Sequence, residues 1–183
     1  MSLREDKNSV AEIQQDFIST PWQEHNLVLL ASSSKLWNTE KGKAIDYGNL
    51  LHEIFSKIYT KEDVNKVIFQ YHKHGIVETE QLSVIRNNIS KVINHPKLKK
   101  YFLEDVVIYN EREIVDFDNQ VIIPDRLVFI DDYVVIIDYK TGTPSKKHHQ
   151  QLLKYDQVLQ SMNFKVDKKI LIYINNEIEL VEV

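Results

Sequence analysis

The sequence predicts a mixed α+β or α/β fold, with helices in the N-terminal half and mostly strands after them. Two observations lead to this prediction. Apolar residues recur at helical spacing in the first half of the chain, whereas the second half contains short apolar runs of strand length. The composition is that of a globular domain, since 43% of the 183 residues are hydrophobic and 27% are charged.

The helices are expected to follow an N-terminal arm. Residues 1–45 are predicted to be this arm or linker, and their first three residues are compatible with an added leader. From Asp46 to Ile58 apolar residues recur at helical spacing, which predicts the first helix. Two more helices are predicted over Glu62–Lys73 and Thr79–Ile93, each followed by a helix-ending residue.

Short apolar runs separated by turn residues predict the strands of the second half. These runs are Val106–Tyr109, Glu113–Phe117, Val121–Ile130 and Tyr133–Tyr139. A helix is then expected from Pro144 to about Met162, followed by closing strands over Lys169–Ile174 and Ile178–Val183. The order is therefore helices, an antiparallel meander, a helix and two strands.

Composition excludes several classes of function. The chain has no cysteine, which rules out disulfides, cysteine-based zinc sites, iron–sulfur clusters and a cysteine nucleophile, and fits a reducing compartment. No long apolar run predicts a membrane span, and the polar start is no secretory signal. The net charge of the chain is −4, whereas a protein that binds nucleic acid on its own usually has an excess of basic residues. Any nucleic acid must therefore be held locally or by another domain.

The most informative stretch is a predicted hairpin with Asp131-Asp132 at its tip. An even-length loop there places Asp125 opposite Asp138. The two carboxylates would repel by roughly 3 kcal/mol, at a Cβ separation of about 5 Å and an effective dielectric near 20. Lys140 shares their face and would offset part of the repulsion, and a divalent cation such as Mg²⁺ would offset more. For any single aspartate, a polar strand end would be explanation enough.

The residues of this hairpin resemble a known nuclease signature. Pro124-Asp125 followed by Asp138-Tyr139-Lys140 is similar to the PD-(D/E)XK signature, and the longer form ending in Thr141-Gly142 is similar to its RecB-type branch. That branch includes the C-terminal nuclease domains of RecB and AddA helicase–nucleases. The resemblance implies a metal-dependent DNA nuclease domain over residues 46–183. Its restriction-endonuclease-like core would have a central mixed sheet flanked by helices.

Two further motifs support the RecB-type branch. Gly48 and His52 form a Gly-X-X-X-His pair on one helical face, and RecB-type nucleases carry such a histidine at the metal. Gln151 and Tyr155 form a Gln-X-X-X-Tyr pair on the helix after the lysine. There the resemblance implies contact with DNA or support of the active-site residues. Alone, each pair is common and would be assigned a structural role.

The resemblance also implies a role for each site residue. The catalytic residues would be Asp125, Asp138 and Lys140, with the lysine orienting a water or stabilising charge on the phosphate oxygens. Mg²⁺, or alternatively Mn²⁺, would be held by both aspartates, by His52 and by the backbone carbonyl of Tyr139. No Fe–S cluster is expected, because the four cysteines of AddB-type relatives are missing.

Two other groups of residues are candidates whose role the sequence leaves open. Glu111 and Glu113 alternate onto one face, and either would serve as the family's upstream acidic residue, with Glu111 slightly ahead. Each also fits a structural or solvated role. Lys146 and Lys147 stand beside the expected site and fit either phosphate contact or a solvated helix start.

The expected partners are DNA, the helicase motor of the same parent chain and a second subunit of AddB or RecC type, in the bacterial cytoplasm and away from membranes. No Gly-X-X-X-X-Gly-Lys phosphate-binding loop occurs, so an excised C-terminal domain is expected. The expected activity is that of an exonuclease in double-strand-break end processing and recombinational repair. The alternatives are a non-catalytic module for DNA binding or subunit docking, a free-standing nuclease, and a globular domain with an incidental charged hairpin.

Overall fold

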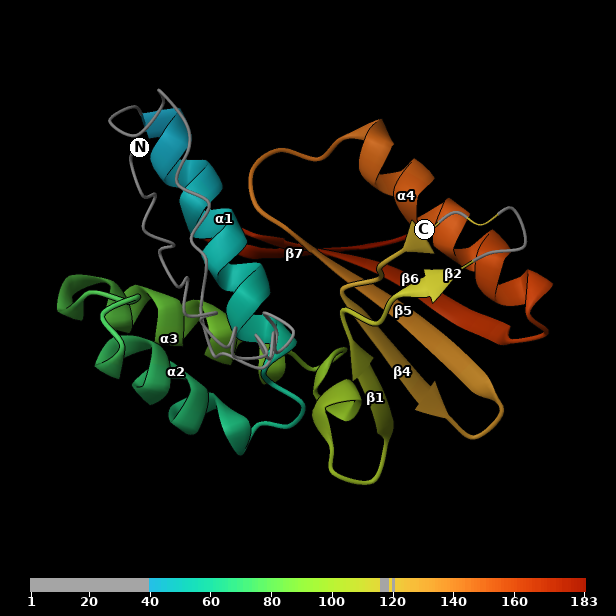
Figure 1. Cartoon of the computed structure of the whole chain (residues 1–183), viewed down its shortest axis with the longest axis horizontal. Helices are drawn as coiled ribbons and strands as arrows, with labels where there is room; N and C mark the ends of the chain where they lie inside the picture. Colours follow the sequence, from blue (N-terminus) through green and yellow to red (C-terminus); the bar gives the residue numbers. More distant parts are fainter. Residues whose placement is uncertain (1–39, 116–118, 120) are drawn as a thin grey trace, which may run out of the picture. The chain divides into compact units, whose positions relative to one another are not determined.

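A computed structural model describes residues 40–115, 119 and 121–183, all of which fall in one compact unit, Lys35–Val183. Its helices are α1 (Glu40–Ser56), α2 (Asp63–Lys73), α3 (Thr79–Ile93) and α4 (Lys146–Ser161), with a short 3₁₀ helix, η2 (Lys99–Phe102). Its strands are β1 (Val107–Asn110), β2 (Ile114–Val115), β3 (Val121–Ile122), β4 (Arg126–Ile130), β5 (Tyr133–Lys140), β6 (Lys165–Ile174) and β7 (Ile178–Glu182). The prediction of a mixed α+β fold with a helical N-terminal half is confirmed (Figure 1).

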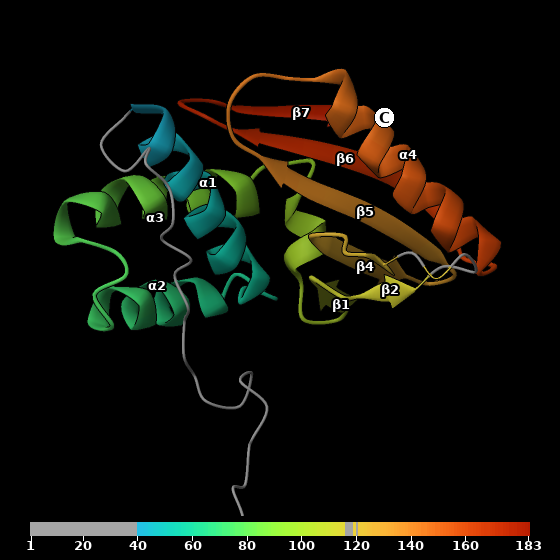
Figure 2. The same cartoon turned by 45° about the horizontal axis from the view of Figure 1, so that its top comes forward.

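A five-stranded sheet in the order β1-β4-β5-β6-β7 forms the centre of the fold. Among the described strands, only β5 and β6 pair in parallel, and α4 makes the long crossover that a parallel connection requires. The other neighbours in the sheet are antiparallel, and β2 and β3 form a separate ribbon. The expected central mixed sheet is therefore present, with α4 along it and α1, α2 and α3 grouped together (Figure 2).

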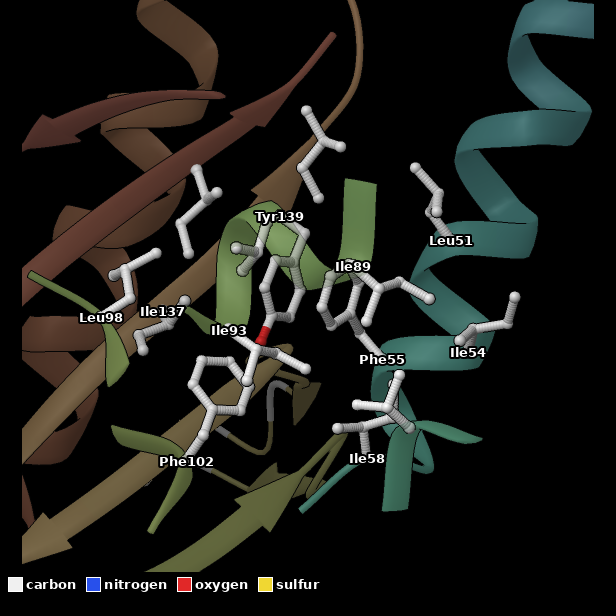
Figure 3. Close-up of a cluster of buried hydrophobic side chains, with 14 of the residues drawn as sticks. Leu51, Ile54, Phe55, Ile58, Ile89, Ile93, Leu98, Phe102, Ile137 and Tyr139 are labelled. Carbon is white, nitrogen blue, oxygen red and sulfur yellow. The ribbon is translucent and has the colours of Figure 1, made fainter. Parts of the chain in front are cut away.

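Alternate residues of the sheet pack against helices on its two faces. Ile137 and Tyr139 of β5 belong to a core cluster that they share with α1, α2 and α3. Figure 3 shows this cluster, in which Phe55 of α1 stacks on the ring of Tyr139. Ile136 belongs instead to a second cluster, shared with α4. Because side chains alternate along a strand, Asp138 lies on the face of the sheet that α4 covers.

The β4–β5 hairpin has the predicted register. Its pairs run from Ile130–Tyr133, next to the two-aspartate tip, to Arg126–Ile137 at the other end. The ladder ends there, so Asp125 lies one residue beyond the last pair. The hydrophobic pattern and the even loop length were thus sufficient to align the two strands.

Several element boundaries differ from the prediction. Helix α1 begins at Glu40 rather than Asp46, because its first turn is mostly charged and offers no apolar stripe. The predicted strand Val121–Ile130 is broken into β3 and β4 around Pro124, which has no N–H to give to a ladder. Strand β6 begins earlier than predicted, at Lys165, because its pairing with β5 continues into an exposed, charged end.

The remaining elements agree with the prediction to within a few residues. The end of the predicted strand Glu113–Phe117 and most of the predicted arm, residues 1–39, lie outside the described residues. Helix α4 begins after Ser145, whose hydroxyl accepts a hydrogen bond from the Lys147 N–H and caps the helix.

Candidate active site

The two aspartates of the hairpin lie at the same end of the sheet. Asp125 immediately precedes β4, and Asp138 lies near the end of β5, one step beyond the pair Arg126–Ile137. The Oδ2 atom of Asp125 accepts a 2.8 Å hydrogen bond from the Tyr139 N–H, which holds the carboxylate against β5. Continuing the register by one residue would bring Asp125 to the level of Asp138, but the observed contact of Asp125 with β5 is the bond to the Tyr139 N–H, not a ladder pair.

Asp138 is a fully buried carboxylate. Burial and then the charge of Asp125 raise its pKa from 3.8 to about 6. The Nζ atom of Lys140 lies 2.5 Å from Asp138 Oδ2, and its lowering effect on this pKa is smaller than the two raising effects. This ion pair is poorly directed, since neither Asp138 oxygen accepts a well-oriented hydrogen bond from the described residues. The protein therefore compensates this buried charge only in part.

His52 reaches Asp125 from α1. Its Nδ1 atom lies 3.3 Å from Asp125 Oδ2. Burial lowers the pKa of His52, but the hydrogen bonding and charge of Asp125 raise it more, so the net shift is upward. The histidine of the Gly-X-X-X-His pair is thus a direct neighbour of the first aspartate.

Gly48 allows α1 to approach the end of β5. A Cβ atom at this position would lie 2.6 Å from Thr141 Oγ1, closer than non-bonded atoms come. Thr141 directly follows Lys140, so the missing side chain brings the helix that carries His52 against the strand that carries the lysine. The missing side chain of Gly48 thus leaves room for a close partner, and that partner is Thr141.

Of the two candidate glutamates, Glu111 lies against Asp125. Its N–H donates a 3.0 Å hydrogen bond to the Asp125 carbonyl, and its backbone adopts a left-handed φ of 47°. Partial burial and then the charge of Asp125 raise the pKa of Glu111, although its side chain still reaches solvent. Glu113 is also exposed and immediately precedes the β2–β3 ribbon.

Helix α4 brings the Gln-X-X-X-Tyr pair to the segment that leads to the first aspartate. Gln151 Nε2 donates a 2.6 Å hydrogen bond to the Tyr155 hydroxyl, which in turn donates to the carbonyl of Ile123 at 3.2 Å. This geometry favours support of the site over direct contact with a substrate. Lys146 and Lys147 form the first turn of the same helix, and both are exposed.

His148 is a neighbour of the site that the sequence did not select. Its Nδ1 atom lies 3.0 Å from the Tyr173 hydroxyl, and Tyr173 pairs in parallel with Lys140. Burial and then the charge of Lys140 lower the pKa of His148. The sequence does not point to this histidine, because the parallel register of β5 and β6 is not visible in the residue pattern.

The site offers the donor types of a divalent cation site, but not a preassembled cage. Within the described residues, no three His, Asp or Glu side chains converge as a metal site, because His52 faces Asp125 and Lys140 faces Asp138. The observation that fits a cation is the buried Asp138 carboxylate, which accepts no well-oriented hydrogen bond from any described residue. Two carboxylates, an imidazole and the Tyr139 carbonyl are donors that suit Mg²⁺ or Mn²⁺. These residues therefore fit a metal by their chemistry.

A comparison with known families identifies this domain. A family model described as the PD-(D/E)XK nuclease superfamily matches residues 27–180. The chain belongs to the PD-(D/E)XK nuclease superfamily. Members of this superfamily are generally metal-dependent nucleases, and the mixed sheet with its helices is consistent with their restriction-endonuclease-like fold. The superfamily predicted from the hairpin is confirmed, whereas this match does not distinguish the RecB/AddA branch.

Comparison of the PD-(D/E)XK domain with solved structures gives a distant match. Among the chains of solved structures that match, one described as "Crystal structure of SSO0001" is 20% identical, with a TM-score of 0.32. The alignment covers 72% of this chain and 65% of that chain, so the domain spans less than two thirds of that structure. No curated protein matches the sequence significantly.

None of the helices within the described residues of the PD-(D/E)XK domain is both long enough and apolar enough to cross a lipid bilayer.

Proposed function

We propose that this PD-(D/E)XK domain is a Mg²⁺- or Mn²⁺-dependent deoxyribonuclease that hydrolyses phosphodiester bonds. The observation that carries the proposal is the buried carboxylate of Asp138, which accepts no well-oriented hydrogen bond from the described residues and lies beside Asp125 and Lys140. Burying charges in this way does not favour folding, because desolvation and like-charge repulsion both oppose it. A cluster kept despite this cost fits a site that receives a cation and a phosphate.

In this proposal Asp125, Asp138 and Lys140 are the catalytic residues. Both aspartates, with His52 and the Tyr139 carbonyl, would hold the metal. When bound, the metal would supply Lewis-acid polarisation of the scissile phosphate and a bound water of lowered pKa. Lys140, most of whose side chain is buried, would orient that water or stabilise the charge that develops on the phosphate oxygens.

The finer assignment is to the RecB/AddA branch, with exonuclease activity. It is supported by the contact of His52 with Asp125 and by the hydrogen bonds that join Gln151 and Tyr155 to Ile123. The absence of cysteine fits this branch better than the cluster-binding relatives. The proposed context is a helicase–nuclease of the bacterial cytoplasm, with a motor in the same parent chain and a second subunit of AddB or RecC type. Its role would be double-strand-break end processing and recombinational repair.

DNA would be delivered to the domain rather than captured by it. The net charge of −4 disfavours autonomous binding to a polyanion. The exposed Lys146 and Lys147, at the start of α4, would supply local phosphate contacts. The isolated chain should therefore bind DNA weakly, and this binding should weaken further as salt is added.

The test is cleavage of end-labelled single- and double-stranded DNA in Mg²⁺, in Mn²⁺ and in EDTA. Cleavage should require a metal and should vanish in Asp138→Ala. The matched control is Asp132→Ala, which removes an exposed carboxylate at the hairpin tip and should leave cleavage unchanged. Cleavage that persists in EDTA or in Asp138→Ala would refute the proposal. Binding of DNA without cleavage in either metal would instead favour the non-catalytic module.

A further inference from the structure

The largest fully buried side chain among the described residues is a cation, Arg126, and it directly follows Asp125. It forms no ion pair with any described carboxylate. Its guanidinium donates instead to four oxygens: the carbonyls of Ile58 (2.8 Å), Tyr59 (2.6 Å) and Tyr101 (2.8 Å), and Asn110 Oδ1 (3.1 Å). Its carbon Cζ also lies 4.1 Å from the centre of the Phe102 ring. Two of these carbonyls lie just beyond the C-terminus of α1, where unpaired carbonyls and the helix dipole favour a cation.

Asn110 reinforces this contact from the neighbouring strand. Asn110 and Arg126 are directly paired between β1 and β4. The amide nitrogen of Asn110 lies 3.4, 3.1 and 3.1 Å from the carbonyl oxygens of Phe55, Ser56 and Ile58, respectively. The two side chains together, here called the α1 clamp, therefore contact four backbone carbonyls at and just beyond the end of α1, those of Phe55, Ser56, Ile58 and Tyr59.

The chain neighbours of the α1 clamp are site residues. Asp125 precedes Arg126, and Glu111 follows Asn110, with the Glu111 N–H bonded to the Asp125 carbonyl at 3.0 Å. On α1, His52 lies about one turn before Phe55 and Ser56, whose carbonyls Asn110 contacts. The α1 clamp thus joins α1, which carries His52, to the start of β4, which follows Asp125, close to the contact between His52 and Asp125.

We propose that Arg126 and Asn110 are positioning residues of the nuclease site, which set His52 against Asp125. This inference rests on the proposed function for its catalytic meaning, but not for its geometry. Loosening the clamp should let the end of α1 move away from β4. The contact of 3.3 Å between His52 and Asp125 should be lost first, since no other described residue is within ion-pair distance of this imidazole.

The test compares the wild-type chain with Asn110→Ala, which removes the donor to α1 and leaves Arg126 in place. The first readout is the imidazole ¹H–¹⁵N signals of His52 in metal-free protein at one fixed pH. In Asn110→Ala these signals should move toward those of the exposed His74. The second readout is Mn²⁺ affinity by calorimetry, which should fall by about 10- to 100-fold, the usual effect of losing a residue that orients a ligand.

The control separates positioning from loss of stability. Ile68→Val shortens a fully buried side chain of α2 in the same core cluster and should change neither readout. If Asn110→Ala does not fold, Asn110→Asp replaces it, because the carboxylate still faces Arg126 but no longer donates to the helix. His52 signals that stay at their wild-type positions in the folded variant would refute the proposal that the α1 clamp positions His52. A wild-type chain without Mn²⁺ affinity would instead refute the nuclease proposal, since the first readout needs no metal.

Discussion

Replacing Asp138 with asparagine should stabilise the metal-free protein at neutral pH. Burial and the charge of Asp125 raise the pKa of Asp138 from 3.8 to about 6. At about 1.4 kcal/mol for each pKa unit, ionisation of this carboxylate costs the folded state about 3 kcal/mol. Asparagine has nearly the same shape and no charge. The free energy of unfolding of Asp138→Asn should therefore exceed that of the wild type by about 3 kcal/mol, or about 6–12 °C in Tm.

The gain should depend on pH in one direction. Below about pH 4 the carboxyl is neutral in both the folded and the unfolded wild type, so the two proteins should be equally stable. Between about pH 4 and pH 6 the unfolded chain has released the proton while the folded chain still binds it. The wild type therefore loses stability as pH rises through this window, and the full difference is present above pH 6. An aspartate stabilised by its ion pair would give the opposite trend.

The assay is urea unfolding in EDTA, followed by circular dichroism at about pH 3.5, 5 and 7.5. Asp132→Asn is the control, because it removes an exposed carboxylate and should show no gain at any pH. Adding Mn²⁺ at about 100 times its Kd should stabilise the wild type by about 2.7 kcal/mol and leave Asp138→Asn unchanged. An Asp138→Asn protein that is less stable than the wild type at pH 7.5 would refute the reasoning. So would a gain of equal size at pH 3.5.

Three further predictions concern the neighbours of the two aspartates. Gly48→Ala should slow cleavage of labelled DNA about 100-fold, because its Cβ would lie 2.6 Å from Thr141 Oγ1 and would push α1 away. Adding Thr141→Ala should restore most of the rate, and a double variant as slow as Gly48→Ala would contradict this. Lys140→Met should abolish cleavage but leave calorimetric Mn²⁺ affinity equal or higher, since no ammonium then competes for Asp138; weaker binding would argue against that competition. Gln151→Ala should slow cleavage more than it weakens Mn²⁺ binding, and equal losses would place Gln151 at the metal.

The hairpin and the α1 motif could be predicted because local periodicity determines both. A strand period of two and an even loop leave one register, which the structure has from Ile130–Tyr133 to Arg126–Ile137, one residue short of Asp125 and Asp138. Helical spacing alone puts Gly48 and His52 on one face. Only the fold shows that the close neighbour of Gly48 is Thr141.

The α1 clamp could not be predicted, because most of its acceptors are backbone carbonyls. Arg126 donates to the carbonyls of Ile58 and Tyr101, which stand 68 and 25 positions away in the sequence. Every residue has a carbonyl, so no residue type marks such a partner. In the sequence Arg126 reads as an ordinary polar residue after the conspicuous Pro124-Asp125. His148 was missed for a different reason, because only the parallel pairing of β5 with β6 brings Tyr173, which His148 contacts, beside Lys140.

The contacts divide the site into a fixed half and an electrostatically unbalanced half. Asp125 is held by the Tyr139 N–H and by His52. The α1 helix that carries His52 is contacted at its C-terminal end by the α1 clamp, and at Gly48 it packs closely against Thr141. Within the part of the chain that the structure describes, Asp138 has only the poorly directed ammonium of Lys140 as a partner. A rigid ligand preserves geometry, and an undercompensated charge provides the drive to bind a cation. The charge that would attract a cation therefore belongs to Asp138, whereas the position of α1 determines where His52 lies relative to Asp125. Variants of Asp138 should therefore change stability and metal affinity together, whereas variants that move α1 should change metal affinity in excess of their effect on stability.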